Sequence, residues 1–595
     1  VNDTSQLYDY YNRGRMEKQL MKQWVTTRCR ADLSKVAARY NISETFAEVL
    51  VKRGLYDWAS MDGYLFDDMV SIPKASEMLG LCEAADLIEQ KLSQGKKMHI
   101  VGDYDVDGVM STYILCHGLR SLGGDVSFRL PHRQKDGYGI RDYMVTEAKE
   151  QGVDTIITCD NGISAGQPIQ TAKELGMTVV LTDHHEVPMK DGEELLPSAD
   201  VIVDPKQSVD NYPYPQLCGA GIAYKLIYEL YHRAGKKGCD RELLPFAAMA
   251  TVCDVVPLYG ENRSIVRRGL AGIHQTGNIG LNALIKHLDF HKEIRAMDLG
   301  FRIGPCINAP GRLRDATESL ELFMETDAEC AAQRAARIVE TNEERKLRTR
   351  SMTKQAAEEV QKQPLPPVLV VYLQECHESV AGIVAGNLRE QFYRPVYVIT
   401  DSGDHLKGSG RSIPGYHMQQ ELQACQKYLT EFGGHAAAAG FSLRREQLEG
   451  LKSALLAHCS LTQEQLIEKV TYDREVALAE MDTTLVTQLS WMEPTGEQNA
   501  PAVFAKRDAQ IAQIRMCGAD MHIAQVRFVE NGKIYQAVDF SGEECIGNAV
   551  RDRYGEQVWE RLKQGERGEY TVDILFSVSI NERYGSLQLQ LIDCQ

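Results

Sequence analysis

Four short apolar runs, each followed by an aspartate, constrain the fold of this 595-residue chain more than any other feature. The runs are Met98–Val101 before Asp103, Thr155–Cys159 before Asp160, Val179–Thr182 before Asp183, and Val201–Val203 before Asp204. Runs this short, bounded by Gly and Asp, are typical of buried parallel strands. Stretches of helical character, such as Ser111–Leu122 and Gln167–Leu175, lie between them. The resulting β-α-β-α order predicts an open α/β sheet.

The whole chain is predicted to be an α/β multidomain protein. Its length predicts several domains, at about 100–200 residues each. A long Ala/Arg/Glu-rich segment ends at Pro364, and a strand-helix-strand pattern resumes at Val368. Beyond Pro501, short segments of alternating character indicate a small all-β barrel or sandwich. We expect a helical region over 1–95, a parallel-sheet domain over 96–320, a connecting helix over 321–364, an α/β domain over 365–465 and an all-β domain over 466–595.

The charge and the cysteines limit the class of protein. The 66 Lys and Arg against 83 Asp and Glu give a net charge of −17, so a nucleic-acid partner would need a local basic surface. The 15 cysteines show no Cys-x-x-Cys spacing, which argues against a zinc site and fits a reducing compartment. There is no signal-peptide pattern and no apolar run of about 18 residues, the length of a membrane span. We expect a cytoplasmic protein without a membrane segment.

The strongest local signal is the alternating acidic motif Asp103-Tyr104-Asp105-Val106-Asp107-Gly108. Three carboxylates this close together repel one another and raise each other's pKa unless a cation neutralises them. Oxygen ligands suit Mg²⁺ or Mn²⁺. A calcium loop of the EF-hand type is excluded, because its twelfth position would be Ile114 instead of a bidentate Glu. A solvated acidic turn remains the alternative.

Further polar groups follow the other expected strands. Asp160 and the triplet Asp183-His184-His185 come directly after two apolar runs, and Asp254 interrupts a third apolar stretch. Ligands bind at the carboxyl ends of the strands in open parallel sheets. A buried aspartate needs a partner, and a metal ion is the simplest one. The sequence therefore predicts a metal site built from several loops at one edge of the sheet.

These motifs resemble the RecJ branch of the DHH phosphoesterase superfamily. The matching segments are Gly102–Gly108, Cys159–Gly162, Leu181–His185, Gly219–Ala223, Cys253–Leu258, Ile307–Leu313, Gly408–Ser412, Gly433–Gly440 and Pro494–Pro501. The resemblance covers roughly residues 96 to 595. It implies a DHH domain, a DHHA1 domain joined to it by a long helix, and a C-terminal OB-fold.

The resemblance also implies an activity and a set of metal ligands. It implies a 5′-to-3′ exonuclease that degrades single-stranded DNA to mononucleotides in recombination and repair, with two Mn²⁺ ions and Mg²⁺ as a substitute. Asp160 would bridge the two ions. Asp105, with Asp103 as a ligand or a supporting residue, would hold one ion, and Asp107, His184 and Asp254 the other. His185 would act on the substrate as a catalytic group, and Asp183 would orient a histidine.

Residues for the 5′ phosphate and the DNA backbone are also implied by family position. They are Arg133, Arg312, Ser409, Arg411 and His435. An ordinary surface salt bridge is the alternative for each arginine. Seven basic residues against three glutamates in 331–354 fit either a groove for single-stranded DNA or a solvated helix face. Tyr138 fits either base stacking or core packing, and Asp204 fits a structural acid.

Two other functions remain open at this point. One is a DHH phosphoesterase acting on short oligonucleotides or pyrophosphate, and the other is a non-catalytic DNA-replication scaffold. The chain length argues against the first, and the intact set of acids and histidines argues against the second.

Family resemblance implies single-stranded DNA-binding protein and a helicase as partners, and we expect a monomer. The 12 Lys or Arg and 20 Asp or Glu in residues 471–595 give a net of −8, which argues against a broad DNA clamp there.

Overall fold

The computed structural model describes residues 22–66, 72–290, 292–518, 523–581 and 585–595. The chain divides into two compact units. One, here the parallel-sheet unit, contains Asp62–Lys346 and Glu493–Ala500; the other, here the barrel unit, contains Val1–Met61, Leu347–Met492 and Pro501–Gln595. Each unit is described by itself. Among the described residues, no helix is both long enough and apolar enough to cross a bilayer.

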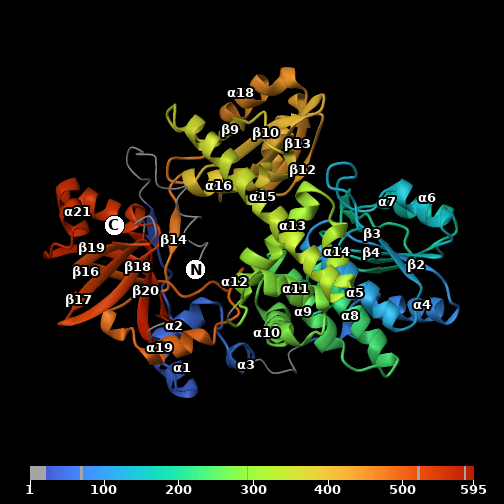
Figure 1. The fold of residues 1–595 in the computed structure, drawn as a ribbon, viewed down its shortest axis with the longest axis horizontal. Helices are drawn as coiled ribbons and strands as arrows, with labels where there is room; N and C mark the ends of the chain where they lie inside the picture. The colour runs from blue at the N-terminus through green and yellow to red at the C-terminus, as the bar shows by residue number, and fades with distance from the viewer. Residues whose placement is uncertain (1–21, 67–71, 291, 519–522, 582–584) are drawn as a thin grey trace. The chain divides into compact units, whose positions relative to one another are not determined.

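The parallel-sheet unit is built on five parallel strands in the order β3-β2-β4-β5-β8 (Figure 1). The strands are β2 Met98–Val101, β3 Val126–Arg129, β4 Thr155–Cys159, β5 Thr178–Thr182 and β8 Val201–Val203. Met98 pairs with Val126 on one side and with Thr155 on the other. The strand order therefore reverses between β2 and β4, which is where ligands bind in sheets of this kind. The small hairpin β6 Met189–Lys190 and β7 Glu193–Glu194 lies outside this sheet.

Helices cover both faces of the sheet, so its strands are almost wholly apolar. Ile100, Ile157 and Val180 face the main core, and Val101 and Ile156 face a second core. The first face is covered by α4 Leu81–Ser93, α5 Val106–Ser121 and α8 Gly219–Arg233, and the second by α6 Asp142–Glu150 and α7 Gly166–Glu174. A continuous apolar strand is stable only when both faces are covered. The predicted open α/β sheet is confirmed.

The remaining helices of this unit enlarge the main core. They are α9 Cys239–Cys253, α10 Gly260–Gly272, α11 Ile279–His287, α12 Ala296–Asp298, the π-helical turn η4 Leu299–Ile303, α13 Gly304–Leu313 and α14 Thr317–Met324. Two helices cross the division between the units, α3 Trp58–Phe66 and α15 Ala328–Val360. Phe246 of α9 is fully buried, with its ring 4.3 Å from that of Tyr113 and 5.7 Å from that of Phe323.

The barrel unit contains an α/β sheet and a closed barrel. The sheet order is β12-β13-β11-β10-β9, with β9 and β10 parallel and the other pairs antiparallel. Its elements are β9 Leu369–Tyr372, α16 Glu378–Phe392, β10 Val396–Ser402, β11 His405–Arg411, α17 Met418–Ala424, β12 Glu431–Gly434, β13 Ala438–Leu443 and α18 Leu448–His458. The predicted second α/β domain is confirmed.

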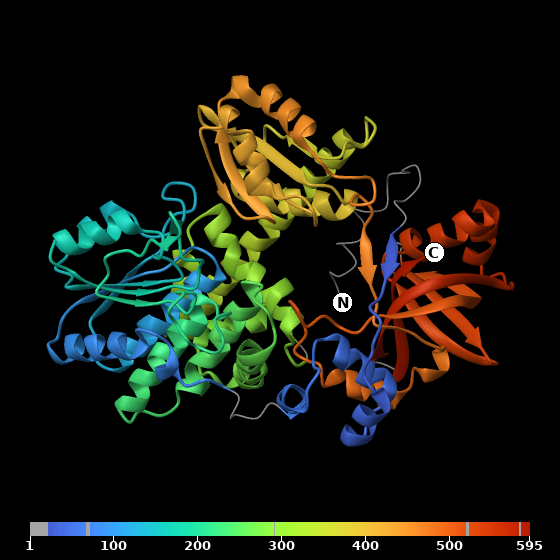
Figure 2. The same ribbon diagram turned by 180° about the vertical axis from the view of Figure 1, so that it is seen from behind.

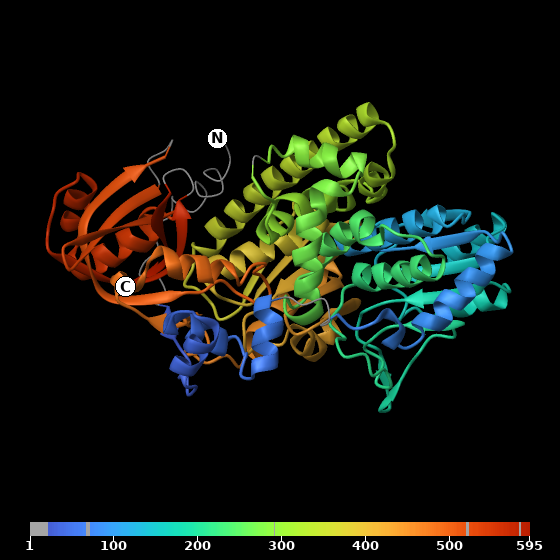
Figure 3. The same cartoon turned by 90° about the horizontal axis from the view of Figure 1, so that it is seen from below.

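The barrel closes because β16 pairs with both β17 and β19. Its strands, in orange and red in Figures 2 and 3, are β16 Phe504–Cys517, β17 Ile523–Glu530, β18 Lys533–Asp539, β19 Tyr570–Asn581 and β20 Ser586–Cys594. This confirms the OB-fold that the resemblance implied. The sequence patterns missed β20 and the two helices α20 Asn548–Tyr554 and α21 Glu556–Lys563.

Two segments differ from the expectations in detail. The N-terminal region contains α1 Leu33–Tyr40 and α2 Glu44–Lys52, but also the strand β1 Gln23–Val25, which pairs with β14 Lys469–Thr471. The long connecting segment is interrupted before α15, where the Asp327 carboxylate accepts the Glu329 and Cys330 amides at 3.0 and 2.8 Å. Asp327 thus caps a new helix.

The barrel unit also contains the short strand β15 Arg474–Glu475 and the helix α19 Thr483–Ser490. The five-part domain division stays a prediction.

The aromatic contacts of Phe246 generate a stability prediction. Replacing Phe246 with Ala removes a fully buried ring and leaves a cavity, so we expect a loss of about 3–5 kcal/mol in the free energy of unfolding. Urea unfolding followed by circular dichroism measures it. The matched control is Phe301→Ala, because the Phe301 side chain is 78% exposed and should change stability by less than about 0.5 kcal/mol. Equal effects of the two substitutions would contradict this packing.

Candidate metal centre

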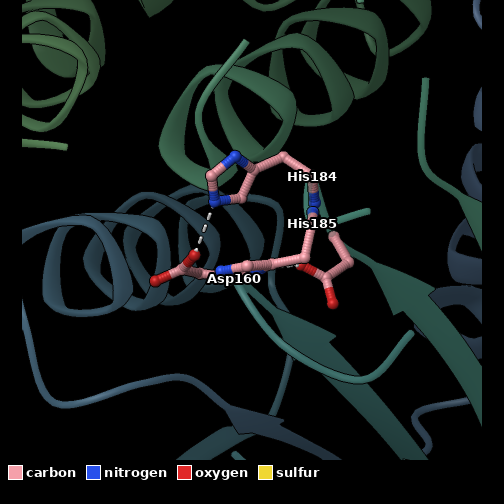
Figure 4. A group of neighbouring side chains, drawn as sticks. Asp160, His184 and His185 are labelled. Atoms are coloured by element: carbon pink, nitrogen blue, oxygen red, sulfur yellow. Dashed lines mark hydrogen bonds and ion pairs between the residues drawn. The ribbon is translucent and has the colours of Figure 1, made fainter. Parts of the chain in front are cut away.

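The site lies at the carboxyl edge of the parallel sheet, where loops after three strands meet the end of a helix. The loop after β2 carries Asp103, Asp105 and Asp107, the loop after β4 carries Asp160, the loop after β5 carries Asp183, His184 and His185, and Asp254 caps the C-terminus of α9. Figure 4 shows Asp160 and His184 directed toward each other, joined by a dashed line. The strand-edge prediction is borne out for the three strand loops, while Asp254 comes from a helix end.

Asp105 and Asp107 are fixed by two helix N-termini. Asp105 is the N-cap of α5, and its carboxylate accepts the amides of Asp107 and Gly108 at 3.0 and 3.2 Å. The Asp107 carboxylate is buried and accepts the amides of Gly219 and Ala220, the first residues of α8, at 2.6 and 2.7 Å. Helix N-termini stabilise negative charge. Burial and the nearby Asp105 nevertheless raise the pKa of Asp107 to about 6.

Asp103 completes the acidic motif from a buried position. Its side chain is 2% exposed, and burial together with the charge of Asp105 raises its pKa well above the usual value. Gly108 lies within the first turn of α5, where a Cβ atom would stand 2.4 Å from the Asp103 carbonyl oxygen. Glycine is therefore needed at position 108 for close packing of the loop and the helix.

Asp160 holds a strained position at the centre of the site. Its φ is +59°, a left-handed conformation that few non-glycine residues adopt. The Tyr138 hydroxyl donates to the Asp160 carbonyl oxygen at 2.8 Å, and His184 Nε2 lies 3.0 Å from Asp160 Oδ1. Burial and then the charge of Asp107 raise the pKa of Asp160 well above its usual value. Strain at a buried acid of this kind is common at functional sites.

The pKa values of the adjacent residues His184 and His185 are shifted in opposite directions. Burial lowers the pKa of His184 to about 3, so its imidazole is neutral and has a lone pair for a metal ion. Burial also opposes the charged form of His185, but a 2.7 Å hydrogen bond from Nδ1 to the Asp183 carboxylate and the charge of that carboxylate raise its pKa to about 9. His185 is therefore protonated at neutral pH.

Asp183 supports both histidines instead of facing solvent. Burial opposes its charge, but the hydrogen bond and positive charge of His185 and the Ile163 amide at 2.9 Å lower the pKa of Asp183. The same carboxylate accepts the His184 amide at 2.8 Å. Asp183 therefore contacts both histidines, and the orienting role that the resemblance implied stays a prediction.

Three groups of donors among the described residues have ligand atoms within 4.8 Å of one another. They are Asp103, Asp105 and Asp160; Asp107, His184 and Asp254; and Asp160, Asp183, His184 and His185. Asp160 belongs to two of these groups. Buried carboxylates with raised pKa values cannot all ionise without a cation, and a donor set of carboxylate oxygens with one imidazole suits Mg²⁺ or Mn²⁺. The residues therefore fit divalent ions, with one group of donors at Asp103, Asp105 and Asp160 and another at Asp107, His184 and Asp254.

Two of the arginines predicted to bind the substrate, Arg133 and Arg312, belong to this unit. Both lie outside the loops after β2, β4 and β5 that carry the acids and histidines. The Arg133 guanidinium stacks 3.8 Å from the centre of the Tyr104 ring, next to Asp103 in the chain, and its buried Nε has no hydrogen-bond acceptor among the described residues. Arg312 is in the last turn of α13. A Cβ on Gly311 would stand 2.6 Å from the Tyr104 carbonyl oxygen, so α13 packs directly on the acidic loop.

The other three assigned residues belong to the barrel unit. Ser409 and Arg411 are on β11, with Arg411 Nη1 3.3 Å from Ser409 Oγ. A Cβ on Gly382 of α16 would lie 2.7 Å from Arg411 Nη2, so this glycine makes room for the guanidinium. His435 lies in the turn between β12 and β13, where its amide donates to the Ala438 carbonyl oxygen at 2.8 Å.

The structure also decides several open alternatives. The Tyr138 hydroxyl contacts Asp160 and lies 3.0 Å from His185 Nδ1, a contact that neither base stacking nor core packing anticipated. Asp204 is fully buried and accepts the Lys206 amide at 2.9 Å, outside the three donor groups. On α15, Arg334 pairs with Glu321 and Glu325. This pairing favours the solvated-face interpretation for Arg334.

Comparison with family models gives three matches along the chain. The DHH family N-terminal domain matches residues 97–251, the DHHA1 domain matches 365–460, and the RecJ OB domain matches 472–593. These three matches follow the order of the parallel sheet, the second α/β sheet and the barrel. The first of them includes most of the acidic and histidine donors described above.

Similar whole proteins were also found. A single-stranded-DNA-specific exonuclease RecJ of Bacillus subtilis is 36% identical over 82% of this chain, which spans only 62% of that protein's length. The RecJ of Dickeya dadantii is 32% identical over 86% of this chain and 89% of its own length. The crystal structure of Thermus thermophilus RecJ in complex with Mn²⁺ has a TM-score of 0.79 at 26% identity, covering 96% of this chain and 79% of that one. A complex with Mg²⁺ from the same organism has a TM-score of 0.73 at 25% identity and covers 96% of this chain and 78% of that one.

The raised carboxyl pKa values predict how Mn²⁺ stabilisation depends on pH. A carboxyl whose pKa is raised to about 6, as at Asp107, stabilises the metal-free fold below the unfolded pKa near 4, and that contribution is lost as the pH rises through 6. Mn²⁺ binds the ionised form and compensates this loss. We therefore expect the increase in melting temperature on adding Mn²⁺ to be larger at pH 7.5 than at pH 5.

Differential scanning calorimetry at both pH values, with EDTA or Mn²⁺, measures this difference. Asp107→Asn should reduce the Mn²⁺-dependent increase at pH 7.5. Asp404→Asn is the matched control, since the Asp404 side chain is 98% exposed. Equal Mn²⁺ effects at the two pH values would show that these carboxyls do not bind the ion.

Proposed function

We propose that this chain, which belongs to the RecJ family, is a metal-dependent exonuclease that degrades single-stranded DNA from its 5′ end to mononucleotides in recombination and repair. The observation that carries the proposal is the pair of donor groups formed by Asp103, Asp105 and Asp160 and by Asp107, His184 and Asp254. Proteins named as single-stranded-DNA-specific exonucleases support the substrate, and RecJ structures with Mn²⁺ and with Mg²⁺ support the metals.

The chain's own residues divide the work as follows. Asp103 and Asp105 would hold one ion, Asp107, His184 and Asp254 would hold the second, and Asp160 would serve both. Two bound divalent ions supply a hydroxide nucleophile and stabilise the charge on the phosphate. Mn²⁺ is the proposed cofactor and Mg²⁺ its substitute.

His185 is proposed to be the catalytic residue on the substrate side. Its Nδ1 hydrogen bond to Asp183 holds the ring in place and keeps it protonated. The second ring nitrogen, Nε2, then carries a proton that can be donated to a phosphate oxygen or to the leaving 3′ oxygen. A single charged histidine at this position favours phosphodiester cleavage over simple metal storage.

Recognition of the strand end is assigned to the arginines and their neighbours. A terminal phosphate carries more negative charge than an internal phosphodiester, and a planar guanidinium binds it with two hydrogen bonds. We propose Arg133, Arg312, Ser409, Arg411 and His435 for this contact. Single-stranded DNA-binding protein and a helicase are proposed partners, and the protein is proposed to act as a cytoplasmic monomer.

Removing the shared ligand should abolish cleavage without unfolding the protein. Asp160→Asn keeps the side-chain volume but removes a charge from the group of Asp103, Asp105 and Asp160, at a position 3.0 Å from His184 Nε2 of the other group, so we expect the rate to fall by at least about 10²–10³-fold. Release of nucleotides from a long single strand in Mn²⁺ measures it, with Asp404→Asn as the matched control. Cleavage at the wild-type rate in Asp160→Asn, with circular dichroism unchanged, would refute the assignment.

Polarity and substrate length are tested with end-labelled strands. A long single strand labelled at its 5′ end should lose the label early, whereas the same strand labelled at its 3′ end should leave long labelled fragments. Early loss of the 3′ label would reverse the proposed direction. A dinucleotide in the same assay tests the short-substrate alternative, and preference for it would replace the proposed function.

A further inference from the structure

Asp254 is held in place by a strained turn. It caps the C-terminus of α9, and the next residue, Val255, has a φ of +58°. This left-handed conformation after a helix is usually adopted by Gly or Asn and is rare for a β-branched residue. The Val255 side chain is 63% exposed, so its own packing does not impose the conformation. The residues that follow it in the chain must hold the turn.

Two buried side chains bind the carbonyl groups of that turn. The Tyr214 hydroxyl lies 3.2 Å from the carbonyl oxygen of Pro257 and 2.8 Å from that of Tyr259. Asn262 Nδ2 lies 3.1 Å from the Pro257 oxygen and 2.6 Å from that of Gln216. Tyr214 is 8% exposed and Asn262 is fully buried, so water does not compete for these donors.

The distant segment Glu493–Ala500 completes the support. It belongs to the parallel-sheet unit, although the residues on both sides of it belong to the barrel unit. The Leu258 amide donates to the Glu497 carbonyl oxygen at 2.8 Å. Leu258 is 1% exposed, and a Cβ on Gly496 would lie 2.6 Å from its Cδ1 atom. The segment therefore packs directly on the residue that follows Pro257.

The segment itself is fixed to the rest of its unit at both ends. Arg263 Nη2 donates to the Glu493 carbonyl oxygen at 3.1 Å. Tyr64 donates from its hydroxyl to Asn499 Oδ1 at 2.8 Å, and Asn499 Nδ2 donates to the Pro494 carbonyl oxygen at 2.8 Å. Because the segment is anchored at both ends, its contact with Leu258 can hold the turn at Val255 in one position.

We propose that Glu493–Ala500 is a positioning segment for the metal centre. By holding Leu258, and through it the turn at Val255, it keeps the Asp254 carboxylate within 3.8 Å of His184 Nε2. The inference deepens the proposed function and rests on it, because it assigns the segment to one of the two ion sites. Residues that orient metal ligands commonly change metal affinity by about 10–100-fold when they are replaced.

Mn²⁺ binding to the full chain tests the segment without relying on cleavage. Gly496→Val places a larger side chain against Leu258 and should weaken one of two Mn²⁺ sites by about 10–100-fold, leaving the other unchanged. Isothermal titration calorimetry measures both affinities. Gly166→Val is the matched control, because a Cβ on Gly166 meets nothing within 4 Å. It should bind both ions as the wild type does.

A double-mutant cycle shows whether the effect passes through Asp254. In Asp254→Asn, the weakened site has already lost its carboxylate, so adding Gly496→Val should cause no further loss of Mn²⁺ affinity. Losses that add in the double variant would mean that Gly496 acts elsewhere, and they would overturn the inference. Thermal unfolding in EDTA confirms that each variant is folded.

Tyr214→Phe tests the same turn if Gly496→Val does not fold. It removes only the hydroxyl between Pro257 and Tyr259 and should weaken the same single Mn²⁺ site. If the wild type binds two ions and Tyr214→Phe binds both with unchanged affinity, this inference fails and the proposed function stands. If the wild type does not bind two Mn²⁺ ions, the proposed function fails and the inference with it.

Discussion

Mutual repulsion among buried carboxylates is the constraint on which the rest of this structure depends. Asp103, Asp107 and Asp160 are each at most 3% exposed, and their pKa values are raised because burial and neighbouring negative charges oppose ionisation. Amide groups of α8 at Asp107 and the imidazole of His184 at Asp160 offset part of this cost. Divalent ions would offset the remainder. The sheet order and the helix N-termini are arranged so that these donors meet at one edge.

The two adjacent histidines show how the fold separates chemical roles. His184 is buried against Asp160 and is neutral, which suits a metal ligand, whereas His185 bonds to Asp183 and is protonated. The two histidines are adjacent in the chain, but their side chains have different surroundings in space. Pairs of titratable groups whose environments move their pKa values apart commonly divide acid and ligand functions.

Close backbone packing allows this acid-rich edge to stay rigid. Gly108 lies against the Asp103 loop and Gly219 against Asp160, at distances that a Cβ atom could not occupy without displacing its neighbours. Asp160 and Val255 both have left-handed φ values, and hydrogen bonds to nearby carbonyl groups hold them there. The strain is therefore located beside the ligands and is supported by groups on other elements.

The amino-acid sequence by itself determined the parallel sheet, most of the long helix, the second α/β domain, the all-β character of the C-terminal domain and the acids at the strand ends. Short apolar runs and the aspartates after them are local patterns, and parallel strands place their carboxyl ends at one edge. Only the tertiary structure decided that the Asp107 carboxylate accepts the Gly219 amide at the start of α8, that Tyr138 bonds to Asp160, that burial keeps His184 neutral while Asp183 keeps His185 protonated, and that Glu493–Ala500 packs on Leu258. These contacts join residues far apart in the chain or depend on burial, and local periodicity carries no information about which distant groups share the same space.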